Sequence, residues 1–369
     1  MTRGNSVIEY ILRNKINFTS GPKWLYENIL KNKKVIAISG THGKTTTTSM
    51  IVHIMAKNKL NPSYLVGGDP KGNTSSVKLT KSEYFVIEAD EYDTAFFDKQ
   101  SKFMHYNPYI LLINNIEFDH ADIFHDLKDI IKSFHNLLRL IPSDGRIIIN
   151  KNDLNIKKLL KIGCWSKVIS LDIKEKNGDF NLIKGSEYEV IAKKKKYKLP
   201  NNLIGYHNYS NAVAAIAVCS QLKININKQI KSLESFKGVQ KRMEFIGEFK
   251  GVKIYDDFAH HPTAIKAAIT AVVNKYKSQK LLTIFLPNSN SMHLGVHDDS
   301  LASSFKGSKN VLIITKSRRL KKLFKNNIKI NVIECKSQIG DYLLSNNYFD
   351  NILILSNKNT KDIIEYIKK

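Results

Sequence analysis

The chain has 369 residues, of which 42% are hydrophobic and 25% are charged, and these proportions exclude a disordered or low-complexity polypeptide. No run of about 20 apolar residues is present, so we expect neither a membrane-spanning helix nor a membrane partner. The formal net charge is +25, but the basic residues are spread along the whole length and form no stripe interleaved with aromatic residues. We interpret this charge as a bias toward A/T-rich codons and expect no nucleic-acid partner, although the field would attract nucleotides. The alternative, a nucleic-acid-binding protein, rests on charge alone.

The chain length limits the number of domains, and the cysteines indicate the compartment. A chain of this size can form two or three domains, each with a core of its own. The cysteines are odd in number, far apart and without the spacing of metal ligands: Cys164, Cys219 and Cys335. Free thiols in a reducing compartment explain them most simply, and no signal peptide is visible, so we expect a cytoplasmic protein. The sequence leaves the oligomeric state open.

Residues 1–30 have the pattern of short helices and turns, and the segment that follows them is the most informative of the chain. In residues 35–50 an apolar run leads into two glycines, a lysine and a string of threonines, after which an apolar helical pattern begins. This order predicts a strand, a tight loop and a helix N-terminus, where backbone amides and the helix dipole favour an anion. Lys44 could reach a terminal phosphate and the Thr45 hydroxyl could ligate Mg²⁺.

This loop departs from the general phosphate-loop pattern in one position. The pattern requires a glycine five residues before Gly43, but Ile38 stands there. We therefore predict a shorter variant that opens at Gly40. The alternative is an ordinary turn between a strand and a helix.

Two groups of acidic residues follow predicted strands at residues 84–88 and 109–114. The first group is Glu88, Asp90, Glu91 and Asp93, and the second is Glu117, Asp119 and Asp122, with His120 between them. In open parallel sheets the carboxyl ends of the strands meet where ligands bind, and carboxylate oxygens suit Mg²⁺. The sequence therefore predicts a cation site. The alternative is a pair of solvated acidic loops, in which His120 would have a structural role.

The remaining pattern predicts an α/β protein with a mostly parallel sheet covered on both faces. A helix at 127–140 and a strand at 146–150 continue the alternation, whereas residues 164–203 contain short β-prone pieces that indicate an antiparallel excursion. The lysines at 193–196 inside it suit a solvated hairpin edge. A helix is expected at 211–221. From about residue 238 a second α/β pattern begins, with strands expected at 252–255, 281–286, 311–315 and 352–355.

Two further segments contain candidate site residues. Asn208 and Asn211 lie one helical turn apart and could present amides to a base or a ribose, although a helix cap is an equal alternative. Farther along, Asp256, Asp257, His260 and His261 close a predicted strand directly before Pro262, which suits the first turn of a helix. Polar side chains at such a strand end indicate a site, and a simple turn is the alternative.

Five motifs together resemble the Mur ligase family, ATP-dependent enzymes that form amide bonds in peptidoglycan precursors. They are Gly40-Thr-His-Gly-Lys-Thr45, Glu88-Ala-Asp-Glu91, Asn115-Ile-Glu-Phe-Asp-His120, His207-Asn-Tyr-Ser-Asn211 and the block at 256–262. The resemblance implies a central P-loop ATPase-like domain with a mostly parallel sheet, followed by a smaller Rossmann-like α/β domain. It places a remnant or linker of the family's N-terminal UDP-binding domain at 1–30, the ATP-binding domain at 31–237 and the ligase domain at 238–369.

The resemblance also implies ATP and Mg²⁺ as cofactors and assigns roles to particular residues. The expected catalytic residues are Lys44, which would bind the β- and γ-phosphates, and Glu88 and His120. Thr45 and Glu88 would hold one Mg²⁺ and His120 a second. The implied nucleotide-binding set is Gly40, Thr41, His42, Gly43, Lys44, Thr45, Thr46, Asn208, Asn211, Arg242 and Asp256. Within it, Asn208 and Asn211 would contact adenine, and Arg242 and Asp256 would reach the nucleotide from the C-terminal domain.

The run from Glu88 to Lys102 resembles one branch of the family more narrowly. That branch joins UDP-N-acetylmuramate to the tripeptide L-alanyl-γ-D-glutamyl-meso-diaminopimelate through an acyl-phosphate, in peptidoglycan recycling. These small molecules are therefore the expected substrates. Two alternatives stay open: the sibling branch that adds L-alanine, which is not expected to carry Tyr92 followed by Phe96-Phe97-Asp98-Lys99, and a degenerate ATP-binding remnant that ligates nothing. Asn288 stands where the family has an arginine, which bears on peptide recognition.

Overall fold

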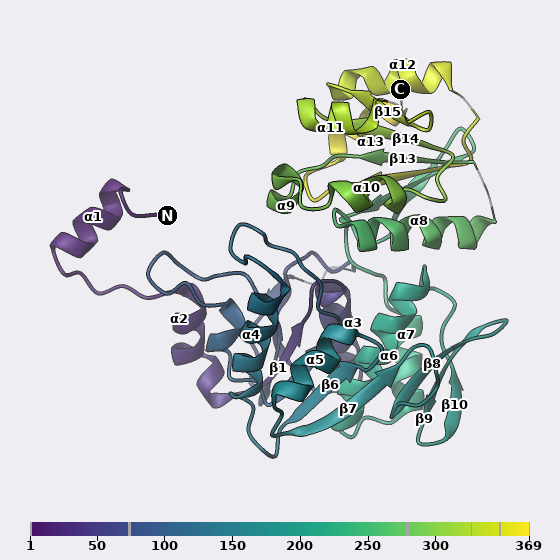
Figure 1. Cartoon of the computed structure of the whole chain (residues 1–369). Helices are drawn as coiled ribbons and strands as arrows, with labels where there is room; N and C mark the ends of the chain where they lie inside the picture. Colours follow the sequence, from purple (N-terminus) through teal and green to yellow (C-terminus); the bar gives the residue numbers. More distant parts are fainter. Residues whose placement is uncertain (1, 73–74, 278–279, 326, 347, 369) are drawn as a thin grey trace. The chain divides into compact units, whose positions relative to one another are not determined.

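The computed structural model describes all residues except 1, 73–74, 278–279, 326, 347 and 369 (Figure 1). The chain divides into two compact units, of which the first comprises residues 1–202 and 209–237 and the second comprises 203–208 and 238–369. Each unit has one β-sheet with helices packed on it. No helix among the described residues is long and apolar enough to cross a membrane.

The first unit is built on a ten-stranded sheet in the order β10-β9-β8-β7-β6-β5-β1-β4-β2-β3. From β8 to β2 every neighbouring pair is parallel, and the antiparallel pairs lie at the two ends of the sheet. The strands are β1 (Lys34–Ser39), β2 (Ser63–Leu65), β3 (Val77–Lys78), β4 (Tyr84–Glu88), β5 (Ile110–Ile113), β6 (Arg146–Asn150), β7 (Lys167–Asp172), β8 (Phe180–Lys184), β9 (Tyr188–Ala192) and β10 (Lys195–Lys198).

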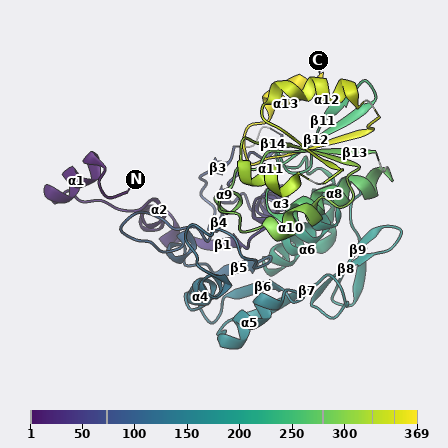
Figure 2. The same ribbon diagram turned by 45° about the horizontal axis from the view of Figure 1, so that its top comes forward.

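Helices cover both faces of this sheet, which explains why its central strands are continuous apolar runs. Side chains of α2, α4 and α5 pack against one face of the sheet and form a single core with it. Helix α3 packs on the other face, with α7 beside it (Figures 1 and 2). The helices are α1 (Ser6–Arg13), α2 (Gly21–Asn28), η1 (Leu30–Asn32), α3 (Lys44–Lys57), η2 (Lys102–His105), α4 (Leu127–Leu138), α5 (Leu154–Ile162), α6 (Tyr206–Gln221) and α7 (Ile226–Glu234).

The sequence predicted most of this unit but not its short or polar elements. The antiparallel excursion is confirmed by β8, β9 and β10, and the lysines at 193–196 form its exposed hairpin, with Lys193 and Lys194 at φ of 50° and 63°. Helix α6 begins at Tyr206, five residues before the predicted start. The strands β2 and β3 and the helix α5 were not predicted, because β2 and β3 have only three and two residues and α5 carries only two buried side chains.

The second unit is a six-stranded sheet in the order β11-β12-β16-β13-β14-β15, parallel except for the β11–β12 pair. Its strands are β11 (Glu244–Phe249), β12 (Val252–Asp257), β13 (Leu281–Phe285), β14 (Asn310–Ile314), β15 (Ile330–Ile333) and β16 (Asn351–Leu355). Its helices are α8 (Pro262–Tyr276), α9 (Asn290–Leu294), α10 (Asp298–Ser304), α11 (Arg318–Phe324), η3 (Lys336–Gln338), α12 (Ile339–Ser345) and α13 (Lys361–Lys368). The four predicted strands are present. The edge strands β11 and β15 were missed, since β11 is interrupted by a register shift at Gly247 and β15 is half exposed.

A buried carboxylate organises the turn between β7 and β8. Asp172 is completely buried, and it accepts hydrogen bonds from the backbone N–H groups of Lys174, Glu175 and Asn177 at 2.8–3.1 Å. The side-chain amide of Asn152 donates a fourth at 3.0 Å. Burial alone would raise the pKa of Asp172, but these donors stabilise the ionised form and hold the pKa well below its usual range.

We expect Asp172→Asn to destabilise the first unit by about 2–4 kcal/mol, because the amide group would face backbone donors. The folded-state pKa is lowered, so the stability from this carboxylate is present above about pH 4 and is lost as the pH falls below it. Urea unfolding from pH 7 to pH 3 would therefore show the variant and the parent converging in acid. Asp144→Asn, at an exposed position, is the control, and a difference that stays constant with pH would contradict the role of the charge.

Candidate active site

The loop between β1 and α3 is shaped by two glycines. Gly40 has a φ of 125°, and a Cβ there would lie 2.8 Å from the carbonyl oxygen of Asn115. Gly43 has a φ of 83° at the N-cap of α3, and a Cβ there would lie 2.6 Å from Oδ1 of Asn211. Both positions therefore require glycine. The loop that they shape leads directly into the N-terminus of α3, as a phosphate-binding loop requires.

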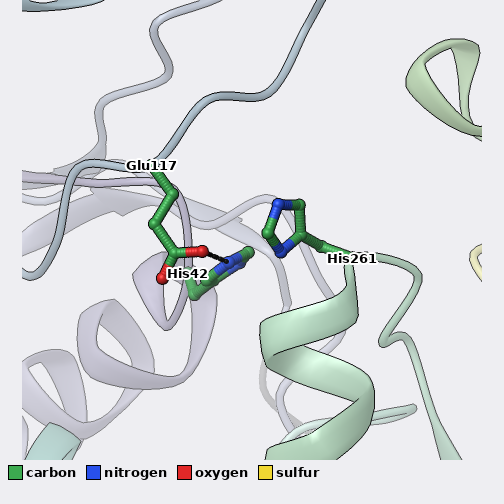
Figure 3. Close-up of side chains that lie close together, drawn as sticks. All are labelled: His42, Glu117 and His261. Atoms are coloured by element: carbon green, nitrogen blue, oxygen red, sulfur yellow. Dashed lines mark ion pairs between the residues drawn. The ribbon is translucent and has the colours of Figure 1, made fainter. Parts of the chain in front are cut away.

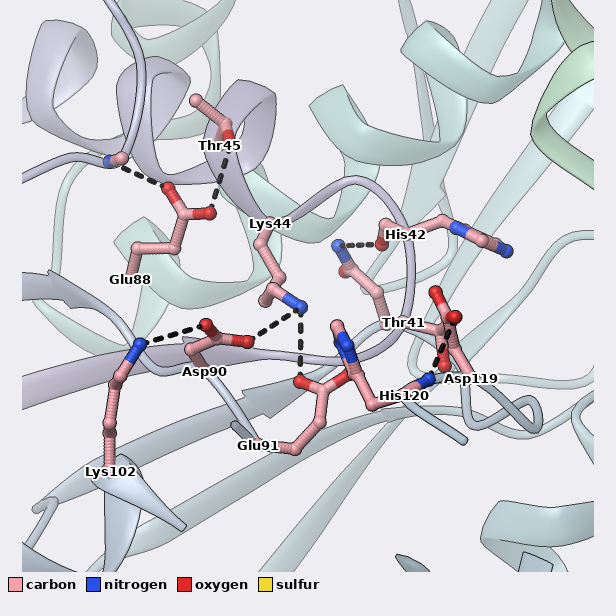
Figure 4. Close-up of polar contacts among 12 residues, drawn as sticks. Thr41, His42, Lys44, Thr45, Glu88, Asp90, Glu91, Lys102, Asp119 and His120 are labelled. Carbon is pink, nitrogen blue, oxygen red and sulfur yellow. Dashed lines mark hydrogen bonds and ion pairs between the residues drawn. The ribbon is translucent and has the colours of Figure 1, made fainter. Parts of the chain in front are cut away.

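Two asparagines that follow β5 hold this loop in place. Asn115 accepts a hydrogen bond from the N–H of His42 through its side chain at 2.8 Å and one from the N–H of Thr41 through its backbone carbonyl at 3.1 Å. The Asn114 side chain donates to the carbonyl of His42 at 3.3 Å. The sequence did not predict a role for either asparagine. Two adjacent amide side chains directly after an apolar strand could nevertheless have indicated hydrogen bonds to a neighbouring loop. Figure 4 shows the loop with Thr41 and His42.

Thr45 and Glu88 meet as the sequence predicted. The Thr45 hydroxyl donates to Oε1 of Glu88 at 2.9 Å, and the backbone N–H of Gly67 donates to Oε2 at 2.8 Å (Figure 4). The sheet sets this contact, because the parallel register of β1 and β4 pairs Ile38 with Glu88. A hydroxyl and a carboxylate at this distance offer two hard oxygen atoms to one cation.

Lys44 lies among carboxylates at the same edge of the sheet. Its ammonium is 3.0 Å from Glu91 Oε2 and 3.5 Å from Asp90 Oδ1, and its side chain is only 12% exposed (Figure 4). Burial alone would lower the pKa of Lys44, but the charges of Glu91, Asp90 and Glu88 outweigh burial and raise it. Lys44 is therefore a permanent cation at neutral pH.

His120 contacts Glu91 rather than Glu88. Its Nε2 lies 3.7 Å from Glu91 Oε1, and ligand atoms of Asp90, Glu91 and His120 all lie within 4.8 Å of one another. His120 has a φ of 55°, and its backbone N–H donates to Asp119 at 2.8 Å. The three predicted metal ligands thus lie in two places, Thr45 beside Glu88 and His120 beside Glu91, and their metal roles stay predictions.

His42 and Thr46, the remaining predicted residues of the loop and of the first turn of α3, differ in exposure. The His42 ring is partly exposed and lies 3.6 Å from a Glu117 carboxylate oxygen, as Figure 3 shows. Thr46 is buried in the first turn of α3. Their predicted contacts with a nucleotide stay predictions.

The two asparagines of α6 have different neighbours. Asn211 is buried, and its side-chain oxygen lies against Gly43, 2.6 Å from where a Cβ would be. Asn208 donates to the carbonyl of Ile204 at 2.8 Å, and both belong to the second unit. The predicted contact of Asn208 and Asn211 with adenine stays a prediction.

Arg242 and Asp256 lie near the amino and carboxyl ends of the first two strands of the second unit. The Arg242 guanidinium is stacked 4.4 Å from the ring centroid of Phe258. Asp256 is buried and accepts a hydrogen bond from the Thr360 hydroxyl through Oδ2, whereas its buried Oδ1 has no hydrogen-bond partner among the described residues. Burial raises the pKa of Asp256 to about 6.

Two family models match the chain in succession. The Mur ligase middle domain matches residues 38–219, and the Mur ligase glutamate ligase domain matches residues 241–355. The UDP-N-acetylmuramate–L-alanyl-γ-D-glutamyl-meso-2,6-diaminoheptandioate ligase of Haemophilus influenzae is 44% identical over 82% of this chain and 67% of its own length. The chain belongs to the Mur ligase family. Mur ligases are ATP-dependent amide ligases, and this chain is a ligase of that type.

Two further comparisons bear on the branch and on the fold. The UDP-N-acetylmuramate–L-alanine ligase of Clostridium acetobutylicum is 36% identical over 82% of this chain and 65% of its own length. A solved murein peptide ligase from Psychrobacter arcticus 273-4 is 33% identical, with a TM-score of 0.74 over all of this chain and 84% of its own. The predicted family and fold class are thereby confirmed.

The residues of the first unit fit the ATP phosphates and Mg²⁺ that the Mur ligase family implies. The loop between Gly40 and Gly43 leads into a helix N-terminus, where an anion is favoured, and Lys44 adds a fixed positive charge there. Carboxylate, hydroxyl and imidazole groups lie directly next to that charge. This donor set suits a hard divalent cation.

We expect Asp256→Asn to stabilise the protein at pH 7 by about 1–3 kcal/mol, because it removes a buried charge. The folded-state pKa is about 6, above its unfolded value near 4. Ionisation of Asp256 therefore costs stability progressively as the pH rises from 4 to 6, and the full cost is present above pH 6. Urea unfolding of the parent and the variant between pH 4 and pH 8 measures this cost. Asp341→Asn on the surface is the control, and parallel pH profiles of the parent and Asp256→Asn would contradict the assignment.

Proposed function

We propose that the protein joins UDP-N-acetylmuramate to L-alanyl-γ-D-glutamyl-meso-diaminopimelate in peptidoglycan recycling, at the expense of ATP. The observation that carries this proposal is the placement of Lys44 and Thr45 at the N-terminus of α3, each in contact with a carboxylate after β4. In the reaction, the muramate carboxylate accepts the γ-phosphoryl group. The tripeptide amine then attacks the acyl-phosphate, and phosphate leaves as the amide bond forms.

Each residue of the first unit has a part that follows from its position. The Lys44 ammonium and the backbone amides at the N-terminus of α3 would bind the β- and γ-phosphates. Thr45 with Glu88 would hold one Mg²⁺, and His120 with Glu91 a second. Such ions neutralise the charge of the transferred phosphoryl group. The protein itself contributes positioning and fixed charges.

Four residues outside the loop complete the proposed nucleotide site. Asn208 and Asn211 would contact adenine, and Arg242 and Asp256 would reach the nucleotide from the ligase domain. We accordingly assign ATP binding to residues 31–237 and the ligase role to residues 238–369. The families' descriptions support this division, since the middle-domain match ends at residue 219 and the glutamate ligase match begins at residue 241.

Sequence identity and one motif favour the tripeptide over L-alanine as the acceptor. The relative named for the tripeptide is 44% identical to this chain, and the relative named for L-alanine is 36% identical over the same share of it. The segment with Tyr92 and Phe96-Phe97-Asp98-Lys99, which is not expected in the L-alanine branch, is present. L-Alanine addition is therefore the second candidate.

We expect phosphate release by the purified protein to require ATP, Mg²⁺, UDP-N-acetylmuramate and the tripeptide together. Lys44→Ala should reduce this release by at least about 100-fold, because the phosphates lose their fixed cation. Lys34→Ala, which removes a lysine in an exposed ion pair with Glu83, is the matched control. Release that depends on L-alanine instead would assign the sibling reaction, and parental activity of Lys44→Ala would refute the proposed site.

We expect Glu88→Gln and His120→Ala to raise the Mg²⁺ concentration needed for half-maximal activity by about tenfold or more, since each removes one cation ligand. Both substitutions leave the sheet intact, so circular dichroism spectra should match the parent. A magnesium titration of phosphate release measures the effect. Unchanged titration curves for both variants would contradict the metal roles.

A further inference from the structure

Lys102 lies beside the carboxylates of the active site, and no role has been given to it above. Its ammonium is 3.4 Å from Oδ2 of Asp90, while the other oxygen of Asp90 is 3.5 Å from the ammonium of Lys44 (Figure 4). Asp90 is therefore shared between two lysines.

The contacts of Lys102 extend into a closed ring of side chains. Its ammonium lies over the ring of Tyr92, 5.5 Å from the centroid, and the Tyr92 ring meets the His120 ring edge-on at 5.0 Å. His120 contacts Glu91, and Glu91 contacts Lys44, so the ring returns through Asp90 to Lys102. The charge of Lys102 is thus connected, through Asp90 and Tyr92, with Glu91 and His120, where a cation is expected.

The backbone fixes the position of Lys102. Its N–H donates to the carbonyl of Tyr92 at 2.9 Å, which closes the loop between the two residues, and Lys102 begins the short helix η2. The next residue, Phe103, is completely buried, and its ring lies 5.2 Å from that of Phe134 in the core. The backbone at Lys102 is therefore held in place by hydrogen bonding and by the packing of Phe103. Lys99, in contrast, lies at the exposed tip of the same loop, and its side chain is 67% exposed.

We infer that Lys102 is a positioning residue. It competes with Lys44 for the Asp90 carboxylate and thereby weakens the ion pair between Asp90 and Lys44. This role presupposes the nucleotide site proposed above. With Lys102 present, Asp90 interacts with two cations, and Lys44 is freer to turn toward a phosphate. Lys102 also offsets negative charge near Glu91 and His120, which weakens the attraction of the same groups for Mg²⁺.

Loss of Lys102 therefore has two effects of opposite direction. Asp90 would interact with Lys44 alone, so phosphates would compete less well and nucleotide binding without Mg²⁺ would weaken. The carboxylates would carry one more uncompensated negative charge, so Mg²⁺ would act at lower concentration. A merely structural role would weaken both kinds of binding together.

The test is ADP binding by calorimetry, first without Mg²⁺ and then across a magnesium titration. For Lys102→Met we expect ADP affinity without Mg²⁺ to fall by about threefold to tenfold, and the half-saturating Mg²⁺ concentration to fall by a similar factor. Lys102→Arg should restore both values, because it keeps the charge. Lys99→Met is the matched control, since it removes a lysine of the same loop that pairs with Asp93. Thermal unfolding of each variant checks that the fold is kept.

Three results would overturn the role of Lys102. They are parental ADP and Mg²⁺ binding in Lys102→Met, parallel weakening of both, or the same shifts in Lys99→Met. Absence of ADP binding in the parent protein would overturn the proposed function as well, and it is visible before any variant is made.

Discussion

The burial of the Lys44 ammonium among carboxylates is the interaction on which the rest of the site depends. A lysine side chain that is only 12% exposed needs partners, and Glu91, itself 3% exposed, has no other cation as near as this one among the described ion pairs. Removing either partner would leave an uncompensated buried charge, which is far more costly than losing a surface ion pair. The N-terminus of α3 and the segment after β4 are therefore coupled through the ion pairs of Lys44 with Glu91 and Asp90.

The parallel sheet explains why these groups meet. Strand β1 pairs with β4 on one side and with β5 on the other, so the segments that follow all three strands emerge at the same edge. One neighbour supplies Glu88, Asp90 and Glu91, and the other supplies Asn114, Asn115 and His120. Polar groups gathered at the carboxyl ends of parallel strands are the usual ligand site of such sheets. The end of β4 and the segment after it provide charged groups, whereas the segment after β5 provides hydrogen bonds that fix the backbone of the loop between β1 and α3.

The charged and polar side chains of the site fall into separate pairs. Thr45 with Glu88 and His120 with Glu91 form two separate donor pairs, so the two cations of the proposed site would not share a ligand. Asp90 is shared by two lysines, which makes it the group through which the loop of Lys102 acts on the centre. In the second unit, desolvation raises the pKa of the buried Asp256 carboxylate to about 6, so its ionised form is present at neutral pH at a cost in stability.

The sequence by itself determined the class of the protein and the composition of the site. The apolar strands, the glycine–lysine–threonine loop and the acidic groups after two strands were sufficient to predict a mostly parallel α/β fold, a phosphate loop and a cation site, because the succession of elements and the residue types of a loop are local properties. The pairing of Thr45 with Glu88 was implied only by the resemblance to the Mur ligase family. The sequence did not reveal the short strands β2 and β3, the half-exposed edge strands β11 and β15, or the roles of Asn114 and Asn115. Only the tertiary structure decided that His120 lies beside Glu91, and that Lys102 shares Asp90 with Lys44. These contacts join side chains whose distances depend on strand register and loop closure, and neither is encoded in the spacing of residues along the chain.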